Sequence, residues 1–95
     1  MASSRTSDLL TANTAIWNGA NRINSVTLIT DGTNAATITV YDNASAASGK
    51  VVAKATASGA QNTVQIRFDN PVYCEVGIYC VVSGTGAAYI VHFGG

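Results

Sequence analysis

The sequence predicts an all-β protein, an antiparallel β-sandwich of seven or eight short strands. Several segments alternate apolar and polar side chains with a period of two, which is the pattern of strands with one buried face. Gly, Asn and Asp residues that favour turns separate these segments, and no segment has the 3.6-residue period of an amphipathic helix. The pattern leaves open whether the topology is jelly-roll or immunoglobulin-like.

The N-terminal fifth of the chain is predicted to be an arm. Residues 1–19 would form this arm and a first strand, and residues 20–95 the sandwich, as a single domain. The stretch LLTANTAIW contains too many Thr and Asn residues for a good helix, so we expect it to be extended. In RINSVTLITDG the apolar phase changes between Ile23 and the pair Val26 and Leu28, which predicts either a β-bulge or the start of the strand near Asn24 and Ser25.

Three more strands follow in AATITVYD, KVVAKATA and NTVQIRFD. In the second of these, Lys50 and Lys54 are expected to face water, which suits a strand at a sheet edge because charge there discourages unwanted pairing. The residues predicted to face the core are Ala36, Ile38, Val40, Val51, Ala53, Ala55, Ala57, Val64, Ile66 and Phe68.

The last two strands, GIYCVVS and AAYIVHF, are predicted to form a C-terminal hairpin around the turn SGTG. Both strands are apolar on both faces, whereas the outer face of an isolated sandwich is normally polar. We therefore expect the outward residues Tyr79, Val81, Ile90 and His92 to be covered by a neighbouring subunit. The alternative is that they are ordinary exposed strand residues.

Charge is scarce in this sequence. Of the 95 residues, five are basic and five acidic, and charged residues make up 11% of the chain, against about 25% in an average soluble protein. Such a composition lacks the basic patch of a nucleic-acid-binding protein and the polybasic segment of a membrane-surface binder. Neither nucleic acid nor a membrane is therefore an expected partner. Depletion of charge is typical of protein interfaces.

Few residues are candidates for chemistry, and we expect no catalytic residue, no cofactor and no metal site. His92 is the only histidine, and the five acidic residues are scattered over turns and strand ends. Calcium binding by the Asp31–Gly32 and Asp42–Asn43 turns is a weaker alternative, because their spacing matches no EF-hand loop. The cysteines Cys74 and Cys80 are interpreted as buried thiols, with a disulfide left open.

The ordered combination of RINSVTLITDGTNAATITVYDNASAASGKVVAKATA and VQIRFDNPVYCEVGIYCVVSGTGAAYIVHF resembles a family of small β-sandwich structural proteins of tailed bacteriophages. The similarity covers roughly residues 20 to 93. It implies a virion protein, a capsid decoration or cement protein that binds the outer surface of the head and stabilises contacts between major capsid subunits. Such a protein would be made in the host cytoplasm, where the lack of a recognisable secretion signal also places its synthesis.

The resemblance supplies no catalytic residues. It implies a homo-oligomer, for which we expect a trimer at a three-fold position of a capsid, with the major capsid protein as partner. The expected interface residues are Leu9, Leu10 and Trp17 in the arm, together with Tyr79, Val81, Ile90 and His92. The alternatives are a head–tail connector, tail or fibre-attachment module, or a carbohydrate-binding module that uses Trp17 and the tyrosines.

Overall fold

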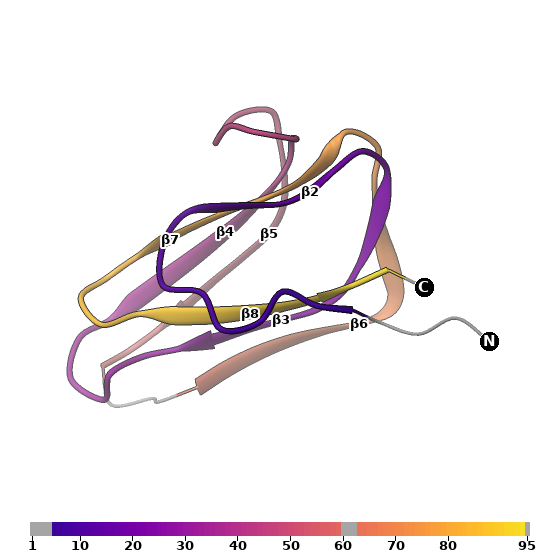
Figure 1. The fold of residues 1–95 in the computed structure, drawn as a ribbon. Helices are drawn as coiled ribbons and strands as arrows, with labels where there is room; N and C mark the ends of the chain where they lie inside the picture. Colours follow the sequence, from indigo (N-terminus) through magenta and orange to yellow (C-terminus); the bar gives the residue numbers. More distant parts are fainter. Residues whose placement is uncertain (1–4, 60–62, 95) are drawn as a thin grey trace.

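The computed structural model describes residues 5–59 and 63–94, which form two four-stranded antiparallel β-sheets packed face to face (Figure 1). Sheet A contains, in spatial order, β1 (Arg5–Thr6), β8 (Ala88–Phe93), β3 (Asn21–Ile29) and β6 (Thr63–Cys74). Sheet B contains β2 (Thr14–Asn18), β7 (Gly77–Ser83), β4 (Ala36–Asp42) and β5 (Lys50–Ala57). None of the described residues is helical. The predicted antiparallel β-sandwich of seven or eight strands is confirmed, and it has eight strands over the described residues.

The core lies between the two sheets and is formed by alternate residues of the central strands. Ile38 and Val40 of sheet B face Leu28, Val91 and other residues of sheet A across it. The residues with almost no exposed surface are Ile23, Val26, Leu28, Ile38, Val40, Cys74, Ile78, Cys80, Tyr89 and Val91. Burial of these apolar side chains supplies the main favourable free energy of folding.

A β-bulge interrupts β3, as its sequence predicted. The pairing of β3 with both neighbours, β6 and β8, shifts register between Ile23 and Ser25. Relative to β8, Asn24 is the extra residue, whereas relative to β6 the additional residues, 68–71, are on β6. The Asn24 side-chain amide donates to the carbonyl of Gly94 at 3.2 Å. The bulge allows Ile23 and Val26 both to reach the core despite the change of phase between them.

Strand β5 is an edge strand, as its lysines indicated, but one of its predicted core residues is not in the core. Val51 is 52% exposed. A register shift in the β4–β5 pair places Ala53 opposite Val40 and Val51 opposite Tyr41. Val52 is thus the extra residue, and it packs against the core in place of Val51. The prediction for Val51 was wrong because alternation alone does not locate a bulge.

The predicted C-terminal hairpin is also wrong. Strand β7 belongs to sheet B and β8 to sheet A, so the turn Ser83–Gly86 crosses from one sheet to the other. The inward faces of the two strands meet across the core, with Cys80 on one side and Val91 on the other. Gly84 and Gly86 have φ angles of 115° and 73°, and a Cβ atom on Gly84 would collide with the Ala35 carbonyl. Only glycine fits this close turn.

The predicted N-terminal arm is part of the sandwich over its described residues; residues 1–4 lie outside them. β1 pairs with β8 in sheet A, and β2 pairs with β7 in sheet B. Residues 7–13, which we call the strap, connect these two strands across the open side of the sandwich (Figure 1). On the opposite side, β5 and β6 lie next to each other.

Candidate interaction surfaces

The outer face of sheet B carries a row of apolar and aromatic side chains that crosses all four strands. Ala15 of β2 lies opposite Tyr79 of β7, Tyr79 opposite Tyr41 of β4, and Tyr41 opposite Val51 of β5. We call these four residues the tyrosine row. Ala15 and Val51 are exposed, and the two tyrosines are half-buried. Directly opposed aromatic residues stabilise a sheet pair, and they also present a large contact area.

The neighbouring rows of this face are rich in hydroxyl groups. Val81, Thr39 and Lys54 form the next row, and Ser83, Thr37 and Thr56 the one after it. The Oγ1 atoms of Thr37 and Thr56 are 3.2 Å apart and share a hydrogen bond. Lys54 carries the single full charge in these three rows. The face therefore offers aromatic, aliphatic and hydroxyl contacts with little charge.

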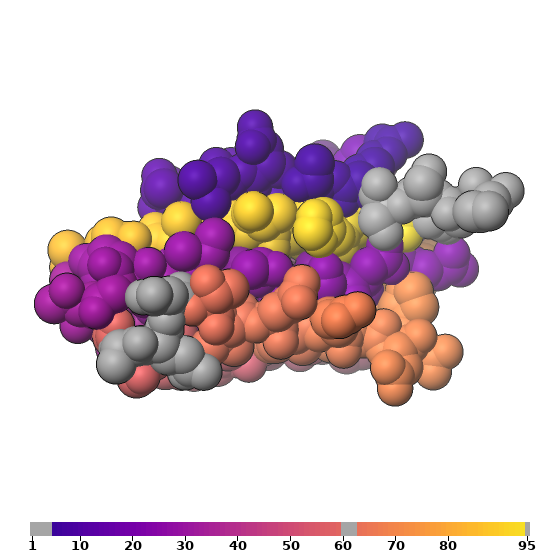
Figure 2. All heavy atoms as spheres, turned by 90° about the horizontal axis from the view of Figure 1, so that it is seen from below, coloured from indigo at the N-terminus to yellow at the C-terminus, as the bar shows by residue number. Residues whose placement is uncertain are grey.

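The outer face of sheet A is more polar. Figure 2 shows the bands of β1, β8, β3 and β6 side by side on this face. Thr6, His92, Ser25 and Arg67 form one row across the four strands, and Ile90, Thr27 and Gln65 are neighbours in the next. The Gln65 side-chain amide donates to Thr27 Oγ1 at 3.3 Å. This face lacks an aromatic row of the kind found on sheet B.

His92 makes one side-chain hydrogen bond that sequence reasoning did not anticipate. Its Nδ1 atom lies 3.0 Å from Ser25 Oγ. Ser25 is 8% exposed, and the two residues are opposite each other on adjacent strands. A nucleophilic serine needs a base that is in turn oriented by a third group. No such third group is seen among the described hydrogen bonds of His92, so we interpret the pair as a connection between β3 and β8.

The predicted interface residues therefore lie in three separate places. Tyr79 and Val81 are on the outer face of sheet B, whereas Ile90 and His92 are on the outer face of sheet A. Leu9 and Leu10 belong to the strap, and Trp17 to β2. A single planar partner cannot cover both outer faces of one sandwich. The sequence missed this separation because it assigned β7 and β8 to one hairpin.

Within the N-terminal group, Leu9 is exposed, whereas Leu10 and Trp17 are half-buried. Leu10 and Trp17 pack against the chain's own core. Trp17 also contacts Phe93, with ring centroids 5.7 Å apart, and the Arg5 guanidinium lies 5.3 Å from the Trp17 centroid. Leu9 is 54% exposed. The three residues share an apolar character in the sequence, but the fold buries two of them in part.

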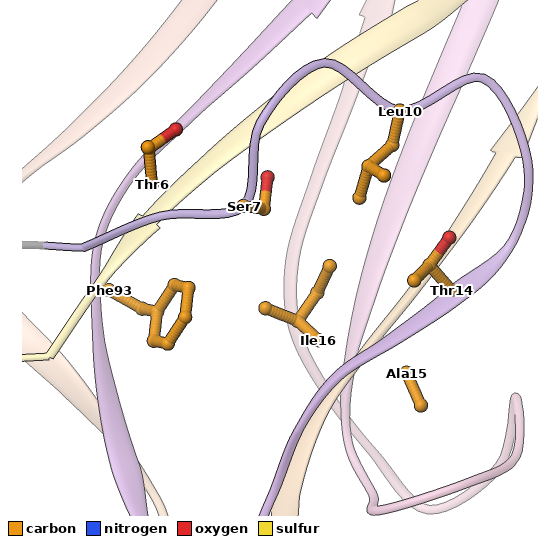
Figure 3. Close-up of a pocket in the computed structure, with 7 residues that line it drawn as sticks. All are labelled: Thr6, Ser7, Leu10, Thr14, Ala15, Ile16 and Phe93. Carbon is orange, nitrogen blue, oxygen red and sulfur yellow. The ribbon is translucent and has the colours of Figure 1, made fainter.

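A pocket of about 230 Å³ lies between the strap and β2 (Figure 3). The side chains of Leu10, Ile16 and Phe93 point into it, and Thr6, Ser7, Thr14 and Ala15 complete its walls. None of these residues is charged at neutral pH. This pocket could not be predicted from the sequence, because it is formed by segments almost 80 residues apart.

The two aspartates considered for calcium are hydrogen-bonded to backbone amides. Asp31 accepts from Thr33 and Asn34 at 2.8 Å each, and these bonds lower the pKa of its carboxyl group. The amides of residues 75–77 donate to the Asp42 carboxylate. N–H groups directed at a carboxylate occupy the positions that a cation would take. The described residues contain no cluster of three or more His, Cys, Asp or Glu side chains suited to a metal ion.

Cys74 and Cys80 are free thiols buried in the core. Desolvation raises the pKa of Cys74 to about 11 and that of Cys80 to about 12. Both side chains are therefore protonated at neutral pH. Since the thiolate is the nucleophile and the metal ligand, this environment makes both residues chemically inert.

Comparison with protein families, with curated proteins and with solved structures shows no match to this chain. The described part of the chain includes no helix of the length and hydrophobicity that a membrane crossing requires.

Proposed function

We propose that this protein is a non-enzymatic structural protein of a phage-type virion, a capsid decoration protein that binds the outer head surface through the outer face of sheet B. The tyrosine row is the observation that supports this proposal. Tyrosine is enriched at protein interfaces and in the small set of residues that provide most of the binding energy. Charged residues are depleted at such interfaces, and this face has a single lysine in its three rows.

The size of the face supports binding in many copies. Four strands about 4.8 Å apart and seven residues long give a face of roughly 400 Å². Stable interfaces of standard size bury about 800 Å² on each partner. One copy would therefore bind weakly, whereas many copies on an assembled shell stabilise it because they bind only the assembled state.

Co-sedimentation with purified heads of the virus that encodes the protein tests this proposal. Wild-type protein should sediment with assembled heads and not with free major capsid protein. Tyr79→Ala should weaken binding by at least about tenfold, as expected for an interface aromatic residue. Ile90→Ala is the matched control, because Ile90 is a half-buried residue on the opposite outer face.

Two results would contradict the decoration role. The first is equal loss of binding in the Tyr79→Ala and Ile90→Ala variants, which would remove the sheet B face as the docking surface. The second is a copy number of only a few per purified particle, measured by quantitative mass spectrometry. A decoration protein should be present in many copies, and a few copies would indicate a connector, tail or fibre-attachment module.

A second candidate function, carbohydrate binding, is favoured by the hydroxyl groups next to the tyrosine row. Aromatic rings supply flat apolar contacts, and Thr37, Thr39 and Thr56 supply hydrogen-bonding groups on the same face. A glycan array separates the two functions. Binding of a defined glycan that is lost in Tyr41→Ala would support this function, and an array without hits would exclude it.

A further inference from the structure

The strap exposes Leu9 because its backbone leaves the edge of sheet A at this point. The Ser7 amide donates to the Val91 carbonyl at 2.8 Å, and Leu10 and Tyr89 exchange two backbone hydrogen bonds of 2.9 and 2.8 Å. Asp8 and Leu9 lie between these two attachments and bulge outward. Leu9 is consequently 54% exposed, while its neighbour Leu10 packs against the core.

Asp8 holds the bulge in an unusual backbone conformation. Its φ angle is 68°, and it is the single described non-glycine residue with a positive φ. The Asp8 carboxylate accepts the Leu9 amide at 2.8 Å, and the Asp8 amide donates to Thr6 Oγ1 at 3.1 Å. Positive φ in a non-glycine residue costs free energy and tends to occur at functional positions. Here it presents an apolar side chain to solvent.

The strap pocket is lined by Leu10, Ile16 and Phe93 together with four smaller residues (Figure 3), and Leu10 and Ser7 in its lining flank the exposed Asp8–Leu9 segment in the sequence. Its volume of about 230 Å³ exceeds the roughly 150 Å³ of an apolar protein cavity that accommodates benzene. It is smaller than the ~300–1,000 Å³ of a typical small-molecule site. The pocket thus has the size and apolar character to accept one aliphatic side chain.

We propose that two copies of the chain associate about a two-fold axis, with Leu9 of each copy inserted into the strap pocket of the other. Leu9 directly precedes the pocket residue Leu10 and lies two residues after the pocket residue Ser7. An interface with two-fold symmetry uses the same patch on both copies. Leu9 and the strap pocket must therefore both belong to that one patch. A ring of three would need the leucine and the pocket on different sides of the molecule.

The net charge and the small area of the strap surface are consistent with a second copy of the chain as the partner. The segment from residue 5 to residue 16 contains one arginine and one aspartate, so two such surfaces carry no net charge and do not repel each other. The strap is a small patch compared with the ~800 Å² per partner of standard interfaces. We expect a weak dimer with a Kd on the order of 0.1–1 mM. The inference does not rest on the proposed function.

Sedimentation velocity of the purified protein from about 10 μM to 1 mM tests the inference. Wild-type protein should shift from monomer to dimer over this range. Leu9→Ser, which removes the apolar side chain, and Ile16→Trp, which enlarges a side chain that points into the pocket, should each weaken dimerisation roughly 10- to 100-fold. Val76→Ser is the matched control, because Val76 is also an exposed aliphatic residue, with 52% of its surface exposed, and lies outside both the strap and the tyrosine row.

A mixture of the leucine variant and the pocket variant provides a test that does not depend on either variant alone. Leu9→Ser retains an intact pocket, and Ile16→Trp retains an intact Leu9, so the mixture should dimerise more than either variant alone. Urea denaturation of each variant confirms that it is folded. Three results would overturn the inference: a wild-type protein that is monomeric up to about 1 mM, a trimer, or an effect of Val76→Ser on dimerisation equal to that of Leu9→Ser.

Discussion

The Asp42 carboxylate accepts the backbone N–H of Val76 at 2.9 Å and thereby connects the end of β4 to the turn between β6 and β7. The amides of Gly77 and Glu75 donate to the same carboxylate at 3.2 and 3.1 Å. Partial desolvation raises the pKa of Asp42, but the three amides and the nearby Lys50 ammonium together lower it below its ordinary value. The turn that leads from sheet A to sheet B is thus fixed by one ionised side chain.

Replacement of Asp42 by Asn should lower the free energy of unfolding by about 1–2 kcal/mol at neutral pH, because charged acceptors form the stronger hydrogen bonds. Since the folded pKa lies below the unfolded value of about 3.9, the carboxylate contributes stability above that pH and loses it as the pH falls through the folded pKa. Urea denaturation between about pH 2 and 7 measures both effects.

The matched control for this prediction is Asp69→Asn, which also removes one negative charge but from an exposed position in β6. Its stability at neutral pH should stay within about 0.5 kcal/mol of wild type. The prediction is wrong if Asp42→Asn and Asp69→Asn lower the free energy of unfolding equally and show the same dependence of that free energy on pH. The turn would then not depend on the Asp42 hydrogen bonds.

Gly77 is predicted to be irreplaceable for a steric reason. A Cβ atom at this position would lie 2.6 Å from the Trp17 carbonyl oxygen and 2.8 Å from Ala44 Cα. Both neighbours are backbone atoms and cannot rotate away. Gly77→Ala should therefore lower the free energy of unfolding by about 2–3 kcal/mol, as overpacking does, and urea denaturation measures this change.

Gly19→Ala is an informative comparison for Gly77→Ala. Gly19 has a φ of 116°, but the nearest atom to an added Cβ is Trp17 Nε1 at 3.9 Å. The Gly19→Ala variant has conformational strain but no collision, so its free energy of unfolding should fall by only about 1 kcal/mol. A Gly77→Ala protein as stable as the Gly19→Ala protein would show that the Trp17 and Ala44 backbones can move.

Local patterns in the sequence predicted the strands and their buried faces well. Ile38 and Val40 are buried with Thr39 between them on the outer side, as alternation indicated. The bulge at Asn24 was also predictable, because it changes the phase within one strand. These features depend on residues that are adjacent in the sequence.

Features that depend on sheet membership were not predictable in this way. The apolar faces of β7 and β8 look the same whether the strands share a sheet or oppose each other across a core. The sequence therefore misplaced Tyr79 and His92 on one surface, and it gave no sign that Ser25 pairs with His92 or that Tyr41 pairs with Tyr79. The strap pocket likewise needs β8 and the N-terminal segment to meet in space.

The two cysteines should make the protein unstable in alkali. Their folded pKa values, about 11 for Cys74 and about 12 for Cys80, lie above the unfolded value of about 8.5. The stability that the protonated thiols contribute is fully present below the unfolded pKa and is lost as the pH rises toward the folded values. Urea denaturation from about pH 7 to 10.5 should show this decline.

The double variant Cys74→Ala, Cys80→Ala provides the control. It will be less stable at neutral pH because it leaves small cavities, but its stability should decline less between about pH 8.5 and 10.5. In the native wild-type protein at pH 7, neither thiol should react with iodoacetamide until the protein is unfolded. Rapid native alkylation would contradict the buried positions of these residues.

Tyr89 fixes the strap to the sandwich, and its loss should free the strap without unfolding the sheets. The Tyr89 hydroxyl donates to the Ala12 carbonyl at 2.7 Å, while its ring is fully buried in the core. Tyr89→Phe keeps the ring and removes this bond, so the free energy of unfolding should fall by only about 1 kcal/mol. The larger effect should be local, because the strap lies outside the eight strands and its other described hydrogen bonds to β7 and β8 are those of Ser7, Leu10 and Asn13.

Amide hydrogen exchange separates these two effects. In Tyr89→Phe, the Leu10 amide, which donates to the Tyr89 carbonyl at 2.9 Å, should lose protection, whereas the Val40 amide in the centre of sheet B should retain it. Local opening exposes strap amides selectively, and global destabilisation would reduce protection at both sites. An equal loss at Leu10 and Val40 would mean that the strap and the sheets unfold together, and that the strap is a cooperative part of the sandwich.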